Sequence, residues 1–153
     1  MTTPSSWRIR EFIFPQDYPA AAEIWKTAKG GVRFSPSDTE AETCKKLERD
    51  PDLFLVAEMD GAIIGTVIGG FDGRRAMIYH LAVRQEYRRQ GIAAALMAEV
   101  EKRIWAKGAL KIYLMMNSEH PDLVDYYRRL GWEKMDVFVA AKEKGKSCSA
   151  SQC

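Results

Sequence analysis

The sequence has few of the residues that mark secreted, metal-binding or membrane proteins. It contains three cysteines, Cys44, Cys148 and Cys153, whose spacing fits no metal site. It has no run of about 18 apolar residues, so it predicts no membrane span. The N-terminus from Met1 to Ser6 also lacks the apolar core of a secretory signal. These absences favour a reduced, cytoplasmic protein that binds no metal and no membrane.

An excess of one charge is missing as well. Lysine and arginine number 23 and aspartate and glutamate 21, which gives a formal net charge of +2. A dedicated nucleic-acid-binding protein usually carries a strong basic excess or stripe, so no nucleic-acid partner is expected. Hydrophobic residues make up 46% of the 153 residues and charged residues 29%, as in ordinary globular chains. At this length we expect one domain with its own core.

Hydrophobic periodicity and turn residues predict a mixed α/β domain. The predicted order β-α-α-β-β-β-α-β-α-β comprises strand 7–12, a helix opened by Pro15 and Asp17 and closed by Gly30-Gly31, a helix from Pro36 to Asp50, strands 53–58, 62–71 and 77–83, a helix from Gly91 to Gly108, strand 111–116, a helix from Pro121 to Gly131, and strand 135–141. Residues 142–153 are rich in lysine, serine and glycine, and we expect them to be disordered.

The stretch that joins the predicted strand 77–83 to the next helix is the most informative. The first turn of a helix presents unpaired N–H groups and the positive end of the helix dipole. Gly91 would let a ligand approach the backbone, and Arg88 and Arg89 add positive charge, so the loop could hold a phosphate or pyrophosphate. The two better-known phosphate-loop patterns are absent. On this pattern alone, a strand-loop-helix turn that binds nothing is an equal alternative.

The loop sequence Arg88-Arg-Gln-Gly-Ile-Ala93 resembles the [QR]-x-x-G-x-[GA] signature of the GNAT family of N-acetyltransferases. In that family the loop amides hold the pyrophosphate of acetyl-CoA, and the preceding strand pairs with its thioester and pantetheine arm. The resemblance therefore implies two groups of acetyl-CoA-binding residues, namely Leu81, Ala82 and Val83 in the strand, and Arg88, Arg89, Gln90, Gly91, Ile92, Ala93 and Ala94 in the loop and helix. The predicted order of elements also resembles the GNAT fold over residues 7–141, as in a small bacterial member.

The segment from Tyr126 to Trp132 resembles a second family motif, in which the hydroxyl of the second aromatic residue sits near the cofactor sulfur. The resemblance implies that Tyr127 is the acid that protonates the departing thiolate. Tyr127 also shares a helical face with Leu123 and Leu130, which is typical of a core residue. Both interpretations can hold together, because a tyrosine ring buries well while its hydroxyl needs a partner.

Seven residues before that tyrosine, the family usually carries an asparagine near the cofactor arm. The corresponding residue here is His120, which departs from the family pattern. Histidine can still donate a hydrogen bond, so the resemblance implies a cofactor contact at His120, with a residue that merely starts the helix at Pro121 as the alternative. Asn117 lies nearby, out of register, and could share the task.

The sequence identifies no general base. The glutamates that serve several family members correspond to Met77 and Met115, which cannot accept a proton. Histidine titrates near neutral pH, so His80 is a candidate, but strand alternation points it away from the Met77 face unless a bulge intervenes. Glu119 and a water relay are equally open. By resemblance, a backbone amide near Ala82 or Val83 would stabilise the oxyanion.

Together these features predict an N-acetyltransferase that uses acetyl-CoA as co-substrate. It would move the acetyl group to a primary amine, on a small molecule or a protein N-terminus, by direct attack in a ternary complex. The alternatives from other classes are a non-catalytic acyl-CoA-binding sensor module and an interaction protein that binds peptides without CoA. A homodimer built through the C-terminal strands is compatible with the sequence, which does not indicate the acceptor.

Overall fold

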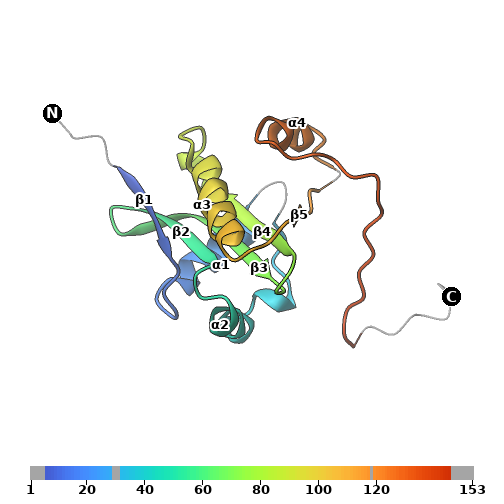
Figure 1. Ribbon diagram of the computed structural model, residues 1–153. Coiled ribbons are helices and arrows are strands. Elements are labelled where there is room, and N and C mark those ends of the chain that lie inside the picture. The colour runs from blue at the N-terminus through green and yellow to red at the C-terminus, as the bar shows by residue number, and fades with distance from the viewer. Residues whose placement is uncertain (1–5, 29–31, 118, 146–153) are drawn as a thin grey trace.

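The computed structural model describes residues 6–28, 32–117 and 119–145 (Figure 1). In chain order the elements are β1 (Trp7–Glu11), α1 (Tyr18–Thr27), the 3-10 helix η1 (Pro36–Asp38), α2 (Glu40–Arg49), β2 (Phe54–Met59), β3 (Ala62–Phe71), β4 (Ala76–Val83), the 3-10 helix η2 (Gln85–Tyr87), α3 (Ile92–Ala106), β5 (Ile112–Leu114) and α4 (Asp122–Arg129). The strands form one sheet in the order β1-β2-β3-β4-β5, antiparallel except for the parallel β4–β5 pair. This mixed sheet with its helices confirms the predicted fold class.

Helices pack on both faces of the sheet, because successive strand residues point to opposite sides. One face carries α3, whose Val100 and Ile104 are fully buried. Gly69 of β3 permits the close approach of α3, since a Cβ at this position would lie 2.9 Å from Cγ2 of Val100. The other face carries α1, whose Trp25 is buried against Phe54 of β2. Each such buried side chain contributes about 1.5–3 kcal/mol to stability, and the two cores hold β4 rigidly between them.

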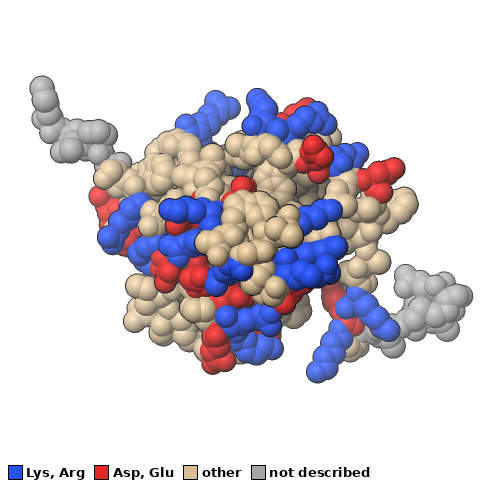
Figure 2. All heavy atoms as spheres, in the orientation of Figure 1, with Lys and Arg blue, Asp and Glu red and all other residues tan. Residues whose placement is uncertain are grey.

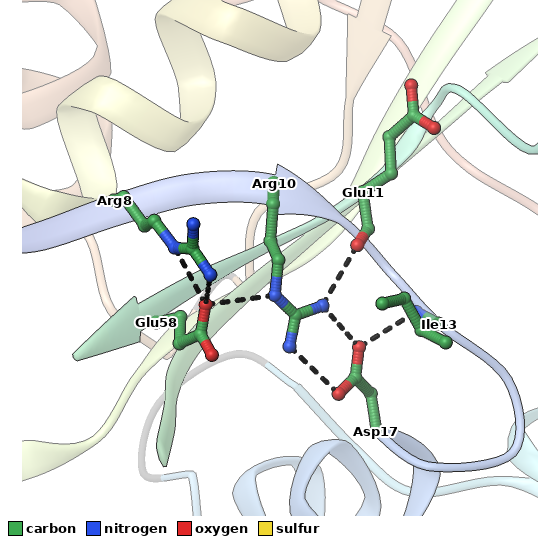
Figure 3. A network of polar contacts seen from close by, with 6 residues as sticks. All are labelled: Arg8, Arg10, Glu11, Ile13, Asp17 and Glu58. Atoms are coloured by element: carbon green, nitrogen blue, oxygen red, sulfur yellow. Dashed lines mark hydrogen bonds and ion pairs between the residues drawn. The ribbon is translucent and has the colours of Figure 1, made fainter. Parts of the chain in front are cut away.

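An ion-pair network fixes the N-terminal side of the sheet (Figure 3). Arg10 of β1 donates to both carboxylate oxygens of Asp17 at 2.6 and 3.0 Å. Its Nε also donates to Glu58 of β2 at 3.0 Å, and Arg8 donates to the same carboxylate at 2.9 Å. Asp17 in turn accepts the N–H of Ile13 at 2.8 Å. The network therefore ties β1, β2 and the loop that enters α1 together.

Several predicted boundaries shift in the structure. The predicted second helix is divided, because Thr39 has an extended backbone that separates η1 from α2. The side chain of Thr39 caps α2 by accepting the N–H of Glu42, and Leu47 packs inward as predicted. The predicted strand 111–116 is shorter and ends at Leu114. The predicted closure of the first helix at Gly30-Gly31 lies outside the described residues.

The strand predicted over 135–141 is wrong. Residues 133–143 have no regular structure, and Val137, Phe138 and Val139 are exposed. Figure 1 shows this segment, in orange to red, running apart from the sheet. Strand-forming residues need a partner edge to pair with, and β5, which lies at the sheet edge, has only the three residues from Ile112 to Leu114. Of the tail predicted to be disordered, residues 146–153 lie outside the described part.

Charged side chains of both signs are interspersed over the face seen in Figure 2. The helices in the described ranges are all too short or too polar to cross a membrane. Neither observation points to a particular partner.

Candidate functional site

The sheet opens between β4 and β5. Their parallel pairing joins Ala76 to Ile112, Met77 to Tyr113 and Ile78 to Leu114, and β5 ends there while β4 continues to Val83. The remainder of β4 therefore has no strand on its β5 side and faces a cavity of about 910 Å³. Unpaired strand edges present N–H and C=O groups that an extended ligand can bind.

This cavity brings most of the predicted site together. It is lined by the end of β4, the loop into α3, the first turn of α3, the residues after β5, and α4. The predicted binding and catalytic residues in its wall are Leu81, Ala82, Val83, Arg88, Arg89, Gly91, Ile92, Ala93, Ala94 and Tyr127. Two others, Gln90 and His120, are not among the lining residues, whereas Asn117 is. Of the two residues considered for a cofactor contact, Asn117 therefore lies in the cavity wall and His120 does not.

The N-terminus of α3 is suited to hold an anion. Gly91 stands at its N-cap with φ +77°, a left-handed conformation that favours glycine. Arg89 also has a positive φ, +64°. Within the described chain no side chain caps this helix, and neither Arg88 nor Arg89 forms an ion pair. The Nε of Arg88 donates to the carbonyl of Val83 at 3.4 Å, which leaves its terminal nitrogens, the Arg89 guanidinium and the first-turn N–H groups available to phosphate oxygens.

Tyr127 lies across the cavity on α4 and is buried. Its ring packs edge-on against Tyr126 and Trp132, with centroid distances of 5.1 and 6.4 Å. Burial, with a smaller effect from Tyr126, raises the pKa of Tyr127 to about 12, so the phenol keeps its proton at neutral pH. In the described structure no side-chain N or O atom is both fully buried and unpartnered. The Tyr127 hydroxyl, which has no partner there, is therefore not fully buried.

A bulge in β4 brings a second titratable side chain to the cavity. The β3–β4 register shifts between the pairs Thr66–Ala82 and Ile68–Tyr79. At the shift His80 takes φ +55°, which is uncommon outside glycine. His80 consequently lines the cavity. Strand alternation predicted this orientation only if a bulge was present in the strand.

His80 belongs to a hydrogen-bonded cluster under the bulge. Its Nε2 lies 2.6 Å from Oδ1 of Asp38, which is 5% exposed. The other carboxylate oxygen of Asp38 accepts the N–H and the hydroxyl of Ser35 at 2.8 and 3.0 Å. Thr66 donates to the carbonyl of His80 at 2.9 Å and accepts from the indole N–H of Trp25 at 3.0 Å. The backbone and the ring of His80 are therefore both fixed.

Asp38 is not among the residues that the sequence indicates as functional. It lies 42 residues from His80, in a 3-10 turn whose sequence, Pro-Ser-Asp, reads as a helix start. The usable signal was a weak one, an aspartate three residues after a serine that could exchange hydrogen bonds with it. Nothing local indicated that this carboxylate would be covered by β4.

A second cavity of about 440 Å³ adjoins the first and shares Met77 and Tyr79 with it. Its charged lining residues come from α2 and from the β3–β4 hairpin, including Lys46 and Arg75. Asp72 in this hairpin accepts the N–H groups of Arg74 and Arg75, so it shapes the turn. Tyr79 and Met77 therefore stand between two spaces, one beside the N-terminus of α3 and one beside α2.

Comparisons with known proteins agree with this geometry. The model of the acetyltransferase (GNAT) family matches residues 18–132. An acetyltransferase of Pectobacterium atrosepticum is 39% identical over 131 residues, which cover 85% of this chain and 92% of the relative. Its curated name is the broad one, acetyltransferase, and specifies no acceptor.

Two solved structures show the same fold. The PaiA N-acetyltransferase from Thermoplasma acidophilum, in complex with coenzyme A, has a TM-score of 0.72 at 23% identity, covering 87% of this chain and 93% of that one. The ribosomal-protein-S18-alanine N-acetyltransferase from Escherichia coli has a TM-score of 0.67 at 20% identity, covering 82% and 77%. Because the family match spans most of the sequence, the chain belongs to the GNAT family and is an acetyltransferase.

Proposed function

We propose that this acetyltransferase moves an acetyl group from acetyl-CoA to a primary amine while both substrates are bound. One observation carries the proposal. A single cavity joins an uncapped helix N-terminus beside two arginines, an unpaired strand edge, and a protonated tyrosine. Acetyl-CoA would supply a thioester, whose acyl carbon is the electrophile.

The loop from Arg88 to Ala94 is proposed to hold the pyrophosphate. The α3 amides would donate to its oxygens, and the helix dipole and two guanidinium groups would offset its charge. The edge from Leu81 to Val83 would pair with the amides of the pantetheine arm, with Asn117 or His120 as a further donor. A β4 amide at Ala82 or Val83 would donate to the developing oxyanion.

Tyr127 is proposed to give its proton to the departing thiolate. Its raised pKa, caused mainly by burial, keeps the phenol protonated at neutral pH, which a donor requires. Tyr127 lines the same cavity as the β4 edge, and its unpartnered hydroxyl is not fully buried. The tyrosine thus combines the two roles that its sequence motif left open, a packed ring and an available hydroxyl.

The acceptor is proposed to be an amine because the similar solved enzymes are named N-acetyltransferases. A small-molecule amine and a protein N-terminus both satisfy the chemistry. The non-catalytic sensor alternative is not favoured, since both the family and the curated relative are acetyltransferases.

Thermal melting with and without acetyl-CoA tests the binding step. A ligand specific for the folded state stabilises it by about 2.7 kcal/mol at 100 times its Kd, so a clear rise in Tm is expected. The double substitution Arg88→Ala and Arg89→Ala should reduce this rise. Arg128→Ala is the matched control, because Arg128 is an exposed arginine of α4 that pairs with Asp125 and does not line the cavity.

Tyr127→Phe tests the chemical step. The variant should keep the acetyl-CoA-dependent rise in Tm but lose acetyl transfer by about 100-fold or more, as removal of a general acid does. No rise in Tm for the native chain at millimolar acetyl-CoA would refute the proposed donor. Binding without any turnover, across peptide and small-molecule amines, would instead support the sensor alternative.

A further inference from the structure

An amine must lose its proton before it can attack a thioester, and the cavity offers few groups to take that proton. Its described lining contains no aspartate or glutamate. Met77 and Met115, which correspond to the glutamates that serve several family members, both line the cavity and cannot accept a proton. Glu119 does not line it. The proton acceptor must therefore be sought among the remaining titratable side chains.

Those side chains are one histidine, arginines and tyrosines. Guanidinium and phenol groups hold their protons at neutral pH. Burial, followed by the negative charges of Asp50 and Asp38, raises the pKa of Tyr79 to about 12, so this phenol in particular cannot act as a base. Among the described lining residues, His80 alone is of a type that exchanges a proton near neutral pH.

We propose that His80 is the general base of this enzyme and that Asp38 is its positioning residue. The assignment deepens the proposed function and rests on it, because it presumes an amine acceptor at the acetyl-CoA cavity. The cavity-facing ring would take the amine proton, and the carboxylate behind it would hold the ring in orientation.

The contacts specify which ring nitrogen acts. Oδ2 of Asp38 accepts two donors from Ser35, one of them a backbone N–H, and Oδ1 faces Nε2 of His80 at 2.6 Å. A carboxylate in these contacts is an acceptor, so Nε2 carries the hydrogen and Nδ1 carries the lone pair. Nδ1 has no partner within the described structure, and no such atom is fully buried without one, so Nδ1 is not fully buried, and the His80 side chain is 16% exposed.

The ring cannot easily turn away from this orientation. Trp25 contacts its edge, with centroids 5.0 Å apart, and Tyr79 packs at 5.5 Å. Thr66 fixes the backbone of the bulge through the carbonyl of His80. A base held by packing and by a hydrogen bond to its second nitrogen follows the general logic of an oriented imidazole.

The proton balance is complete without any further reagent. An ammonium acceptor transfers one proton to Nδ1 of His80, and the neutral amine forms the C–N bond as the C–S bond breaks. The second nitrogen proton is lost as the amide forms and restores the proton that Tyr127 gives to the thiolate. His80 then releases its own proton to solvent, so the enzyme returns to its starting state.

The titratable groups around His80 come from three elements. Asp38 of η1 bonds to the ring, and Tyr79 of β4 packs beside it. Tyr18 of α1 donates to the backbone carbonyl of Asp38 at 2.9 Å. Burial, and then Glu40 and Asp38, raises the pKa of Tyr18, so this phenol stays neutral and leaves Asp38 as the charge nearest to His80.

The kinetic test compares the native chain with His80→Gln. The probes are acetyl-CoA with an N-terminal alanyl peptide, N-α-blocked lysine and a linear diamine, and the fastest acceptor is carried forward. At pH 7 His80→Gln should lower kcat/KM by about 100-fold or more, and the loss should shrink at higher pH as solvent deprotonates the amine. The rise in Tm with CoA should be unchanged. Equal kcat/KM in both proteins across pH 6–9 would overturn the assignment.

Two further variants separate positioning from simple structural damage. Asp38→Asn should lower kcat and displace the pH profile, because the ring loses the acceptor that fixes its tautomer. Thr66→Val is the matched control, since it removes two hydrogen bonds of the same cluster, one to the His80 carbonyl and one from the Trp25 indole, and neither involves a nitrogen of the His80 ring. It should lower Tm yet leave the shape of the pH profile unchanged. A Thr66→Val profile displaced as far as that of Asp38→Asn would mean that Asp38 only supports the fold.

NMR of the His80 imidazole tests the assignment even if none of the probe amines is acetylated. The chain has two histidines, His80 and His120, so a His120→Gln background leaves one imidazole to observe by ¹⁵N NMR. Nε2 should be the protonated nitrogen of the neutral ring, and added CoA should shift the signals of both nitrogens. A proton on Nδ1, or no response to bound CoA, would overturn the assignment. Failure of CoA to bind at all would instead refute the proposed function.

Discussion

Two buried carboxylates in this protein have nearly the same local setting. Asp17 is 7% exposed and Asp38 is 5% exposed. Each accepts a backbone N–H from the preceding turn, Asp17 from Ile13 and Asp38 from Ser35, at 2.8 Å in both cases. Each also bonds at 2.6 Å to a cation-forming side chain on a strand of the sheet.

The two sites differ in the partner and in what lies beyond it. Arg10, the partner of Asp17, is always charged and is also bound by Glu58, so its donors are taken up within the protein (Figure 3). His80, the partner of Asp38, is an imidazole rather than a permanent cation, it lines the cavity, and its second nitrogen has no partner within the described structure. We call the Asp17–Arg10 pair closed, because all of its partners lie within the protein, and the Asp38–His80 pair open, because His80 also lines the cavity. A closed pair acts as a structural brace, whereas an open pair is a candidate for proton transfer.

Arg10→Ala should give the largest change in stability. It would leave the Asp17 carboxylate buried without its cation, and breaking such a pair costs about 3–5 kcal/mol. The side chain of Arg10 is 22% exposed, so we expect a value near the lower limit, about 3 kcal/mol. Urea denaturation at pH 7 measures the loss.

Arg8→Ala is the control for this substitution. Arg8 bonds to the same Glu58 but its side chain is 73% exposed, and exposed pairs contribute only about 0.2–1 kcal/mol. If the two variants lose equal free energy of unfolding, the network around Asp17 is not a closed brace, and the contrast with Asp38 disappears.

The sequence predicted the loop and the helix start at Gly91 better than it predicted the surroundings of His80. Gly91 and the residues around it form a local motif, since a loop and a helix start are determined by neighbours in the chain. The pair of His80 and Asp38 depends instead on a bulge in β4 and on a turn 42 residues away. A bulge changes which face a strand residue points to, and alternation of residue types alone cannot reveal it.

The error at residues 135–141 has a related cause. Val137, Phe138 and Val139 favour a strand by type, yet a strand forms only when a neighbouring edge can pair with it. The sequence signals the propensity of a segment but not the length of the edge available to it. Only the structure shows that β5 is short and therefore offers little edge for pairing.

The pH dependence of the unfolding free energy should differ between the native chain and Asp17→Asn. This difference should be smaller than the loss expected for Arg10→Ala. Burial alone would raise the pKa of Asp17, but the hydrogen bonds from Arg10 and Ile13, and the charge of Arg10, hold it below its usual 3.8. A carboxylate whose folded-state pKa is lowered adds stability above the unfolded value, and this stability is lost as pH falls through the folded pKa. Urea midpoints at pH 7, 4 and 3 should therefore fall more steeply for the native chain. Parallel curves would show that the pair does not favour the ionised carboxylate.

Ser35→Ala should have the smallest effect of the three. It removes the hydroxyl that donates to Asp38 but keeps the backbone N–H and the bond to His80, so we expect a loss of about 1 kcal/mol in unfolding free energy. Ser37→Ala, which removes an exposed hydroxyl beside that of Ser35, should lose less, about 0.5 kcal/mol at most. Asp38 is held by several hydrogen-bond donors, from Ser35 and His80, whereas Asp17 depends mainly on the guanidinium of Arg10. A loss at Ser35 as large as that at Arg10 would therefore show that the Asp38 site, too, is primarily a brace, with the open face of His80 incidental to its role.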